Sequence, residues 1–197
     1  MSTTPTITEP ATQVRPSSIR NLLFWMLSFL VIPASGYLGT FLVGRVDNLP
    51  SALLGGALVG AIVGLAQSLA SRRRLDKLRW TIASALGTAV GVALGTLAIA
   101  YRTSLSDLIL GGIITGVVVG MAQAFALPRT TRLRWIWVPV TTILWALAWA
   151  VTTLAGIKVE EQFIVFGATG AFVYTLLAGL TLLALRLPAI RNAPAKR

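Results

Sequence analysis

The stretch GGALVGAIVGLAQSLASRRRLDKLRW, residues 55–80, joins an apolar segment with regularly spaced glycines to a basic loop and a Leu-Arg-Trp triplet. The same arrangement returns at residues 111–135. A glycine at every fourth position places small side chains along one face of a helix. The stretch therefore predicts apolar helix pairs joined by basic loops and used more than once. The matched positions are Gly56, Gly60, Gly64 and Gln67 in one copy and Gly112, Gly116, Gly120 and Gln123 in the other.

Composition indicates that the solvent of this chain is a membrane. Of 197 residues, 55% are hydrophobic and 12% are charged, whereas a soluble domain has about 25% charged residues. A helix needs roughly 20 apolar residues to cross a hydrocarbon core about 30 Å thick. Six such runs predict an all-α polytopic bundle without a separate soluble domain. The predicted spans are residues 22–43, 51–70, 81–100, 107–127, 135–156 and 163–185.

The net charge of +11 is sorted between the two sides that six spans create. Fourteen of the 17 lysines and arginines lie in the tails and even-numbered connections, and only Arg45, Arg102 and Lys158 lie in the other turns. An excess of basic residues in short loops marks the cytoplasmic side. We therefore predict cytoplasmic termini and attraction of anionic headgroups to that face. A nucleic-acid partner, which this charge suggests for a soluble protein, is set aside.

The chain begins with a stretch rich in Thr, Ser and Pro, which predicts a disordered cytoplasmic tail at residues 1–20, and it ends in a basic cytoplasmic tail at residues 188–197. The first apolar run is too long for the core of a signal peptide, so we expect it to remain as a span. Pro33 lies within it and predicts a kink, because proline has no backbone donor.

The spans repeat as helix hairpins. Trp25, Trp80 and Trp135 recur at equal intervals, each at the entrance of an odd-numbered span, and the last span carries Gly170 and Thr181 where the earlier copies carry glycine and glutamine. A two-span unit returns to the same side, so its copies are parallel. The spacing predicts a six-transmembrane-helix bundle built from three parallel two-helix repeats around a pseudo-threefold axis along the membrane normal. The third span carries its own small-residue face at Gly87, Gly91 and Gly95.

Two interpretations exist for each feature of the repeat. The glycines fit helix packing, because small residues let helix backbones approach closely in lipid; the alternative is that they widen a central pore. The three tryptophans fit interfacial anchors at the headgroup level, with an aromatic ligand cage as the alternative. Gln67, Gln123 and Thr181 are expected at similar depth. They form either interhelical hydrogen bonds or a polar ring that binds a small solute or a lipid headgroup.

The residues that are absent restrict the chemistry. The sequence has no His and no Cys, so thiol and imidazole catalysis, disulfides and the common zinc and haem ligand sets are excluded. No Asp, Glu, Lys or Arg lies in the middle of a predicted span, and such groups mark proton relays and ion pathways. We therefore expect neither an enzyme nor a cofactor or metal.

The pattern GxxxGxxxGxAQ, a basic loop and LRW, given twice and followed by the divergent copy GAFVYTLLAGLTLLALRL, resembles a group of bacterial six-span membrane proteins of uncharacterised activity. In that group the glutamine is often followed by Trp and the third copy has more glycine. In this chain Ser68 and Ala124 follow the two glutamines, and the third copy has Tyr174 and Ala178 at glycine positions. The resemblance covers most of residues 21–187 and implies a bacterial plasma membrane and the repeat architecture. It implies no activity.

Two functional hypotheses follow. The first is a non-enzymatic membrane protein that acts by association with itself, with another membrane protein or with lipid. The second is a passive channel or a substrate-binding transport subunit for a small neutral solute. A continuous polar-lined cavity inside the bundle would favour the second hypothesis, and a solid apolar core would not.

Overall fold

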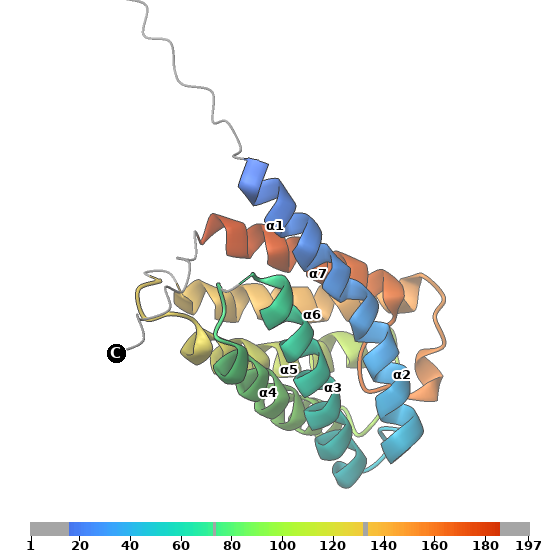
Figure 1. The fold of residues 1–197 in the computed structure, drawn as a ribbon. Helices are drawn as coiled ribbons and strands as arrows, with labels where there is room; N and C mark the ends of the chain where they lie inside the picture. The colour runs from blue at the N-terminus through green and yellow to red at the C-terminus, as the bar shows by residue number, and fades with distance from the viewer. Residues whose placement is uncertain (1–15, 73, 132–133, 186–197) are drawn as a thin grey trace, which may run out of the picture.

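The computed structural model describes residues 16–72, 74–131 and 134–185 (Figure 1). Most of the two predicted tails lies outside these residues. The predicted N-terminal tail, residues 1–20, overlaps the first helix, which begins at Pro16. No strand occurs in the described part of the chain. The helices are α1 (Pro16–Met26), α2 (Val31–Val43), α3 (Leu49–Ala70), α4 (Lys77–Ala98), α5 (Leu105–Ala126), α6 (Trp137–Leu154) and α7 (Ala168–Ala184), with short 3-10 turns η1 (Leu27–Leu30), η2 (Arg134–Ile136) and η3 (Val159–Glu161).

Five helical segments are long and apolar enough to cross a membrane, which indicates a multi-pass membrane protein. They comprise 24, 22, 22, 22 and 21 residues and begin at Arg20, Leu49, Lys77, Leu105 and Arg134. The sixth segment, α7, has 17 residues, which is the lower end of the range that spans a hydrocarbon core. The prediction of an all-helical polytopic bundle is confirmed at this level.

The helical segments pack as a closed ring. Each segment lies against the next one in the sequence, through the pairs α2 with α3, α3 with α4, α4 with α5, α5 with α6 and α6 with α7, and α7 closes the ring against α1. Figure 1 shows α1 crossing α7 and the chain continuing as α2, which lies beside α3. This arrangement leaves a central axis that every segment surrounds.

Polar side chains fix where three of the helices begin. Asn48, Asp76 and Ser104 precede α3, α4 and α5, and each accepts a hydrogen bond from a backbone N–H three residues later. Such N-caps satisfy donors that a helix leaves unpaired at its first turn. Helix starts at 49, 77 and 105 are therefore two to four residues earlier than the apolar pattern predicted.

The first segment is interrupted where proline removes a hydrogen bond. The chain changes from α1 to the 3-10 turn η1 at Leu27 and resumes as α2 at Val31. Pro33 has no N–H to donate to the carbonyl four residues earlier, at Phe29, which lies in the 3-10 turn. The sequence predicted the irregularity, and the structure places it on the N-terminal side of the proline, as the missing bond requires.

The sixth segment differs from its prediction. Residues 163–167 were expected to be helical, but α7 begins only at Ala168, and the preceding residues run without helical structure into the bundle. Ile164, Val165 and Phe166 are at most 5% exposed. Non-helical backbone at membrane depth is tolerated where protein surrounds it. We call residues 163–167 the buried segment.

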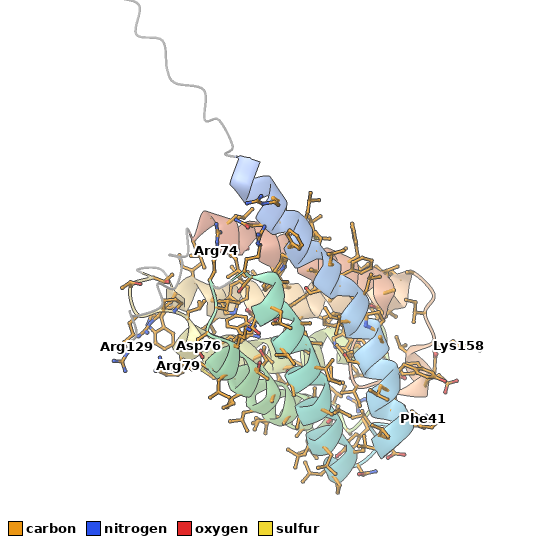
Figure 2. The ribbon with its side chains drawn as sticks, viewed as in Figure 1. Phe41, Arg74, Asp76, Arg79, Arg129 and Lys158 are labelled. Carbon is orange, nitrogen blue, oxygen red and sulfur yellow. The ribbon has the colours of Figure 1, made fainter. Side chains whose placement is uncertain are left out.

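The two ends of the bundle carry different charges (Figure 2). Arg74, Arg79 and Arg129 lie at the end where α3 and α5 finish and α4 starts, and we call this the basic end. Lys158 lies at the opposite end, which also carries an ion pair between Arg102 and Asp107 with an N–O distance of 3.0 Å. It is the sole ion pair found among the described residues.

Candidate functional site

The glycines of the repeated pattern lie between helices of the ring. A Cβ atom on Gly116 would lie 2.7 Å from Thr142 Cα on α6, and one on Gly91 would lie 3.0 Å from the Thr115 carbonyl oxygen on α5. A Cβ atom on Gly56 would lie 2.8 Å from Ala89 Cα on α4. These distances leave no room for a side chain. The remaining predicted packing glycines meet neighbouring segments in the same way: Gly60 and Gly64 against α4, Gly87 and Gly95 against α5, Gly112 and Gly120 against α6, and Gly170 against α6.

A pocket of about 30 Å³ lies inside the ring, and all six segments contribute to it. This volume exceeds the roughly 10–15 Å³ that a cavity needs to hold one water molecule. We call it the central pocket. Its polar lining comes from α3, α4, α5, α6 and α7, and its apolar lining includes Ile32 of α2, Val119 and the buried segment. The polar or partly polar side chains are Gln67, Ser84, Thr88, Gln123, Trp145 and Tyr174.

Two tryptophans orient the two glutamines of the pocket. Trp80 Nε1 on α4 donates to Gln67 Oε1 on α3 over 3.1 Å. Trp137 Nε1 on α6 donates to Gln123 Oε1 on α5 over 2.8 Å. Both glutamines are nearly fully buried. Gln123 Nε2 also donates to Ser84 Oγ across a 2.9 Å gap, so one amide connects three helices. The glutamines therefore form interhelical hydrogen bonds and also line a common pocket.

The third predicted polar position does not join the first two. Thr181 donates to the Leu177 carbonyl of its own helix at 2.9 Å and does not line the central pocket. Tyr174, which stands where the earlier copies have Gly60 and Gly116, contributes from α7 instead. A tyrosine in a glycine position was the signal in the sequence that could have identified it, because its ring must enter the bundle.

Two further residues of the pocket were assigned no role by the sequence. Hydroxyl side chains in helices often bond to a carbonyl of their own helix, as Ser28 and Ser35 do. Ser84 instead accepts the bond from Gln123, and Thr88 lines the same pocket. Both lie on the face of α4 that meets α3, which the glycine spacing of α3 could have indicated.

The central pocket has unused hydrogen-bonding capacity. Gln67 and Thr88 are buried, and both line the pocket. Trp145 Nε1 is also buried and lacks a partner of good geometry within the described ranges. Buried polar groups in proteins are nearly always satisfied by protein or ordered water. These groups therefore favour a pocket occupant that can accept and donate hydrogen bonds.

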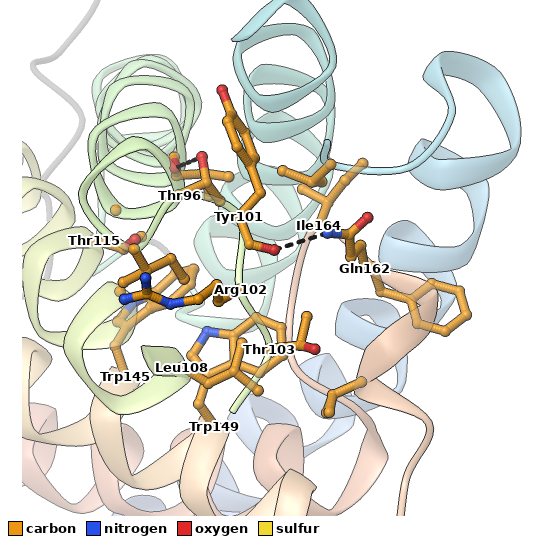
Figure 3. Close-up of a pocket in the computed structure, with 17 residues that line it drawn as sticks. Thr96, Tyr101, Arg102, Thr103, Leu108, Thr115, Trp145, Trp149, Gln162 and Ile164 are labelled. Carbon is orange, nitrogen blue, oxygen red and sulfur yellow. Dashed lines mark hydrogen bonds between the residues drawn. The ribbon is translucent and has the colours of Figure 1, made fainter. Parts of the chain in front are cut away.

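A second cavity, of about 50 Å³, lies between the central pocket and the opposite end (Figure 3). We call it the outer vestibule. Its lining includes Thr96, Thr115, Trp149 and Ile164, and it shares Trp145 with the central pocket. Thr115 Oγ1 donates to the Gly91 carbonyl on α4 over 3.0 Å. Trp145 thus separates two cavities along the axis of the ring.

Gln162 joins the three connections that surround the outer vestibule. Its Nε2 donates to the Tyr101 carbonyl over 2.9 Å, as Figure 3 shows. Its Oε1 accepts from Arg45, and its carbonyl accepts from the Val46 N–H. Its φ of 51° is left-handed, which turns the chain inward from η3 to the buried segment. The sequence analysis missed this residue.

The assignment of the tryptophans as headgroup anchors is wrong for two of the three. Trp25 is 4% exposed and Trp80 is 0% exposed, because each indole N–H bonds inside the bundle; Trp25 Nε1 donates to the Thr175 carbonyl on α7. Trp135 is 47% exposed and packs edge-on against Phe125. The 3-10 turn η2 shifts the entrance of α6, so Trp137 takes the buried position that Trp80 holds on α4.

Aromatic contacts lie beside the central pocket. The ring centroids of Trp80 and Trp137 are 6.0 Å apart on the side of the basic end. The ring centroid of Phe166 in the buried segment lies 5.1 Å from that of Trp145 and 5.5 Å from that of Tyr174. Because these last three rings line the pocket, they must move before a molecule larger than its volume enters.

Comparison of the chain with protein-family models, with curated proteins and with solved structures finds no match. The site is therefore interpreted from its geometry.

Proposed function

We propose that this protein is a non-enzymatic multi-pass membrane protein that binds a small uncharged solute in the central pocket, as a passive channel or a substrate-binding transport subunit does. The observation that carries the proposal is a pocket that all six segments line and in which the buried Trp145 Nε1 has no hydrogen-bond partner among the described residues. A buried polar group without a partner costs about 1–3 kcal/mol. A hydrogen-bonding occupant removes that cost.

The lining of the pocket selects an uncharged occupant. Amide, hydroxyl and indole groups line it together with apolar side chains, and none of the described residues that line it is Asp, Glu, Lys or Arg. An ion moved into such a site would lose its hydration without gaining a counter-charge. The same lining offers no acid or base pair for catalysis, which supports a binding role over an enzymatic one.

The position of the outer vestibule supports entry from the opposite end. Trp145 lines both cavities, and the lining of the vestibule includes Tyr101, Arg102 and Thr103 from the connection between α4 and α5 at the opposite end (Figure 3). On the other side, Trp80 and Trp137 and the buried Leu75 and Leu127 intervene. We therefore expect the Trp145 side chain, which lines both cavities, to move when a solute passes from the vestibule to the central pocket.

The alternative of a protein that acts by association receives less support. Small-residue faces are the surfaces by which helices associate in lipid. In this chain Gly56, Gly91, Gly116 and their counterparts are already covered by neighbouring helices of the ring. A partner protein would have to use the apolar side chains that face outward, and these are also what lipid contacts.

The architecture that accompanies this proposal is three parallel hairpins with six crossings in the plasma membrane of a bacterium. The closed ring of neighbours supports it, as does the pairing of Trp80 with Gln67 and Trp137 with Gln123 at corresponding places. The arginines of the basic end support a cytoplasmic placement of both termini. Arg72 and Arg79 are exposed there, as attraction to anionic headgroups requires.

Acrylamide, a small uncharged amide that quenches tryptophan fluorescence, tests the proposal. The purified protein would carry Trp135→Phe and Trp149→Phe, so that these two residues do not contribute to the fluorescence. We expect acrylamide to quench part of the remaining tryptophan fluorescence, and we expect the further change Trp145→Phe to remove that part. Trp25→Phe is the matched control, because Trp25 is equally buried but does not line the pocket. Iodide should not quench this component, since an anion is excluded. Equal effects of the two substitutions, or equal quenching by iodide, would contradict the proposal.

A further inference from the structure

An apolar groove of about 240 Å³ lies between α2 and the connection from α6 to α7. It exists because α7 begins late, at Ala168, so the buried segment and η3 replace helix at this depth. The groove is far larger than the central pocket or the outer vestibule. Its wall is formed by Pro33, Tyr37, Trp149, Ile157, Phe163 and Val165.

The groove faces the surroundings of the bundle, not its axis. Tyr37 is 69% exposed, and its neighbour on the next turn of α2, Phe41, is 77% exposed. Leu154, at the end of α6, is 75% exposed. Large apolar side chains with this exposure face hydrocarbon in a multi-pass membrane protein. The groove therefore opens sideways into the lipid layer.

Hydrocarbon fits this groove better than water does. Its lining is almost wholly apolar, and the hydroxyl of Thr152, which contributes to it, already accepts a hydrogen bond from the Gly167 N–H over 3.1 Å. A bound water needs two to four polar partners, whereas an acyl chain gains dispersion contacts along every apolar wall.

One charged side chain borders the groove. Lys158 lies at its end, is exposed and forms no salt bridge with any described acidic residue. Glu160 and Glu161 follow in the chain but do not line the groove. An apolar channel with an ammonium group at the membrane surface is complementary to a lipid with a negative headgroup.

We propose that the groove binds one phospholipid from the leaflet at the opposite end, with an acyl chain along Tyr37, Trp149 and Val165 and an anionic headgroup against Lys158. This site is separate from the central pocket, from which Phe166 and Val165 divide it. The inference goes beyond solute binding and stands whether or not the central pocket binds a solute.

Native mass spectrometry of the detergent-purified full chain tests the headgroup contact. With equal amounts of phosphatidylglycerol and phosphatidylcholine added, we expect one retained phosphatidylglycerol in preference to phosphatidylcholine. Lys158→Gln should lower that preference by about fivefold, the contribution of one lysine near an anionic surface. Lys77→Gln, which changes an exposed lysine at the basic end, should leave it unchanged. The proposal would be overturned if Lys158→Gln and Lys77→Gln lowered the preference for phosphatidylglycerol equally, or if the original protein showed no such preference.

A brominated acyl chain locates the lipid. Phosphatidylglycerol with bromine in its chains should quench part of the fluorescence of the Trp135→Phe protein at one lipid per protein, and Trp149→Phe should remove that part. Ala168→Leu, which adds bulk to an exposed residue of the groove wall, should weaken retention of both lipids. Quenching that survives the loss of Trp149, or retention unaffected by Ala168→Leu, would place the lipid elsewhere.

Discussion

Replacing Gly116 with alanine is expected to lower the free energy of unfolding by about 2 kcal/mol. The added Cβ atom would lie 2.7 Å from Thr142 Cα, 2.8 Å from the Thr141 carbonyl oxygen and 3.0 Å from Trp145 Cβ. Two of these atoms belong to the backbone of α6 and cannot yield unless the helix moves. The higher helix propensity of alanine, about 1 kcal/mol, offsets only part of the strain.

Gly111→Ala on the same helix is the matched control for this prediction. The nearest atom to its added Cβ is Ile99 Cδ1 at 3.3 Å, the flexible end of a side chain. We expect a change between zero and a gain of about 1 kcal/mol from helix propensity. Reversible unfolding in mixed detergent micelles, followed by circular dichroism, gives both values. If the two alanines have the same effect, close packing of the glycine faces does not hold the ring together.

Replacing Gln123 with leucine is expected to lower the free energy of unfolding by about 2 kcal/mol. The change leaves Trp137 Nε1 and Ser84 Oγ without the partners they have at 2.8 Å and 2.9 Å. Interhelical hydrogen bonds in membranes contribute on average about 0.6 kcal/mol, but a buried donor left unsatisfied costs about 1–3 kcal/mol. The second effect dominates here, because Trp137 is 1% exposed and has no access to solvent.

Thr181→Val is the control for the glutamine, since the Thr181 hydroxyl bonds only to its own helix. We expect it to change stability by less than about 0.5 kcal/mol. The double variant Gln123→Leu with Trp137→Phe should recover part of the loss, because removing both partners leaves no unpaired donor. If Thr181→Val lowers the free energy of unfolding as much as Gln123→Leu does, the hydrogen bonds of Gln123 contribute no more to stability than a bond within one helix.

The sequence predicted the helices well because apolar length and glycine spacing are local properties. The observed helix bounds of α3, α4 and α5 differ from the predicted spans by a few residues, through caps at Asn48, Asp76 and Ser104 that apolar runs do not reveal. The irregularity that precedes Pro33 was also predicted, since proline lacks a backbone donor.

The buried segment was missed because a short apolar run looks the same in a helix and in an extended chain. Residues 163–166, Phe-Ile-Val-Phe, have β-branched residues between aromatic ones and are followed by Gly167. That composition favours extended structure and was the available signal. The groove beside α2 exists because this segment is not helical, so no feature of the helix pattern could predict it.

The candidate site was predicted in part. Gln67 and Gln123 were identified from the repeat, but their tryptophan partners were not, because a 3-10 turn at the start of α6 exchanges the roles of Trp135 and Trp137. Thr181 was expected with them and lies elsewhere. Tyr174 enters the pocket in its place, which depends on packing between α6 and α7 and not on spacing within α7.

Labelling of single cysteines tests most directly the central claim, that this chain is a membrane bundle with six crossings and a cytoplasmic basic end. The sequence contains no cysteine, so each introduced thiol is the only one. In intact cells, a membrane-impermeant thiol reagent should label cysteines at Asp47, Ser106 and Glu161. Cysteines at Arg72, Thr130 and Asn192 should react only after the cells are opened. Labelling of a cysteine at position 192 in intact cells would mean that α7 does not cross the membrane. Reversal of the whole labelling pattern would contradict the proposed orientation.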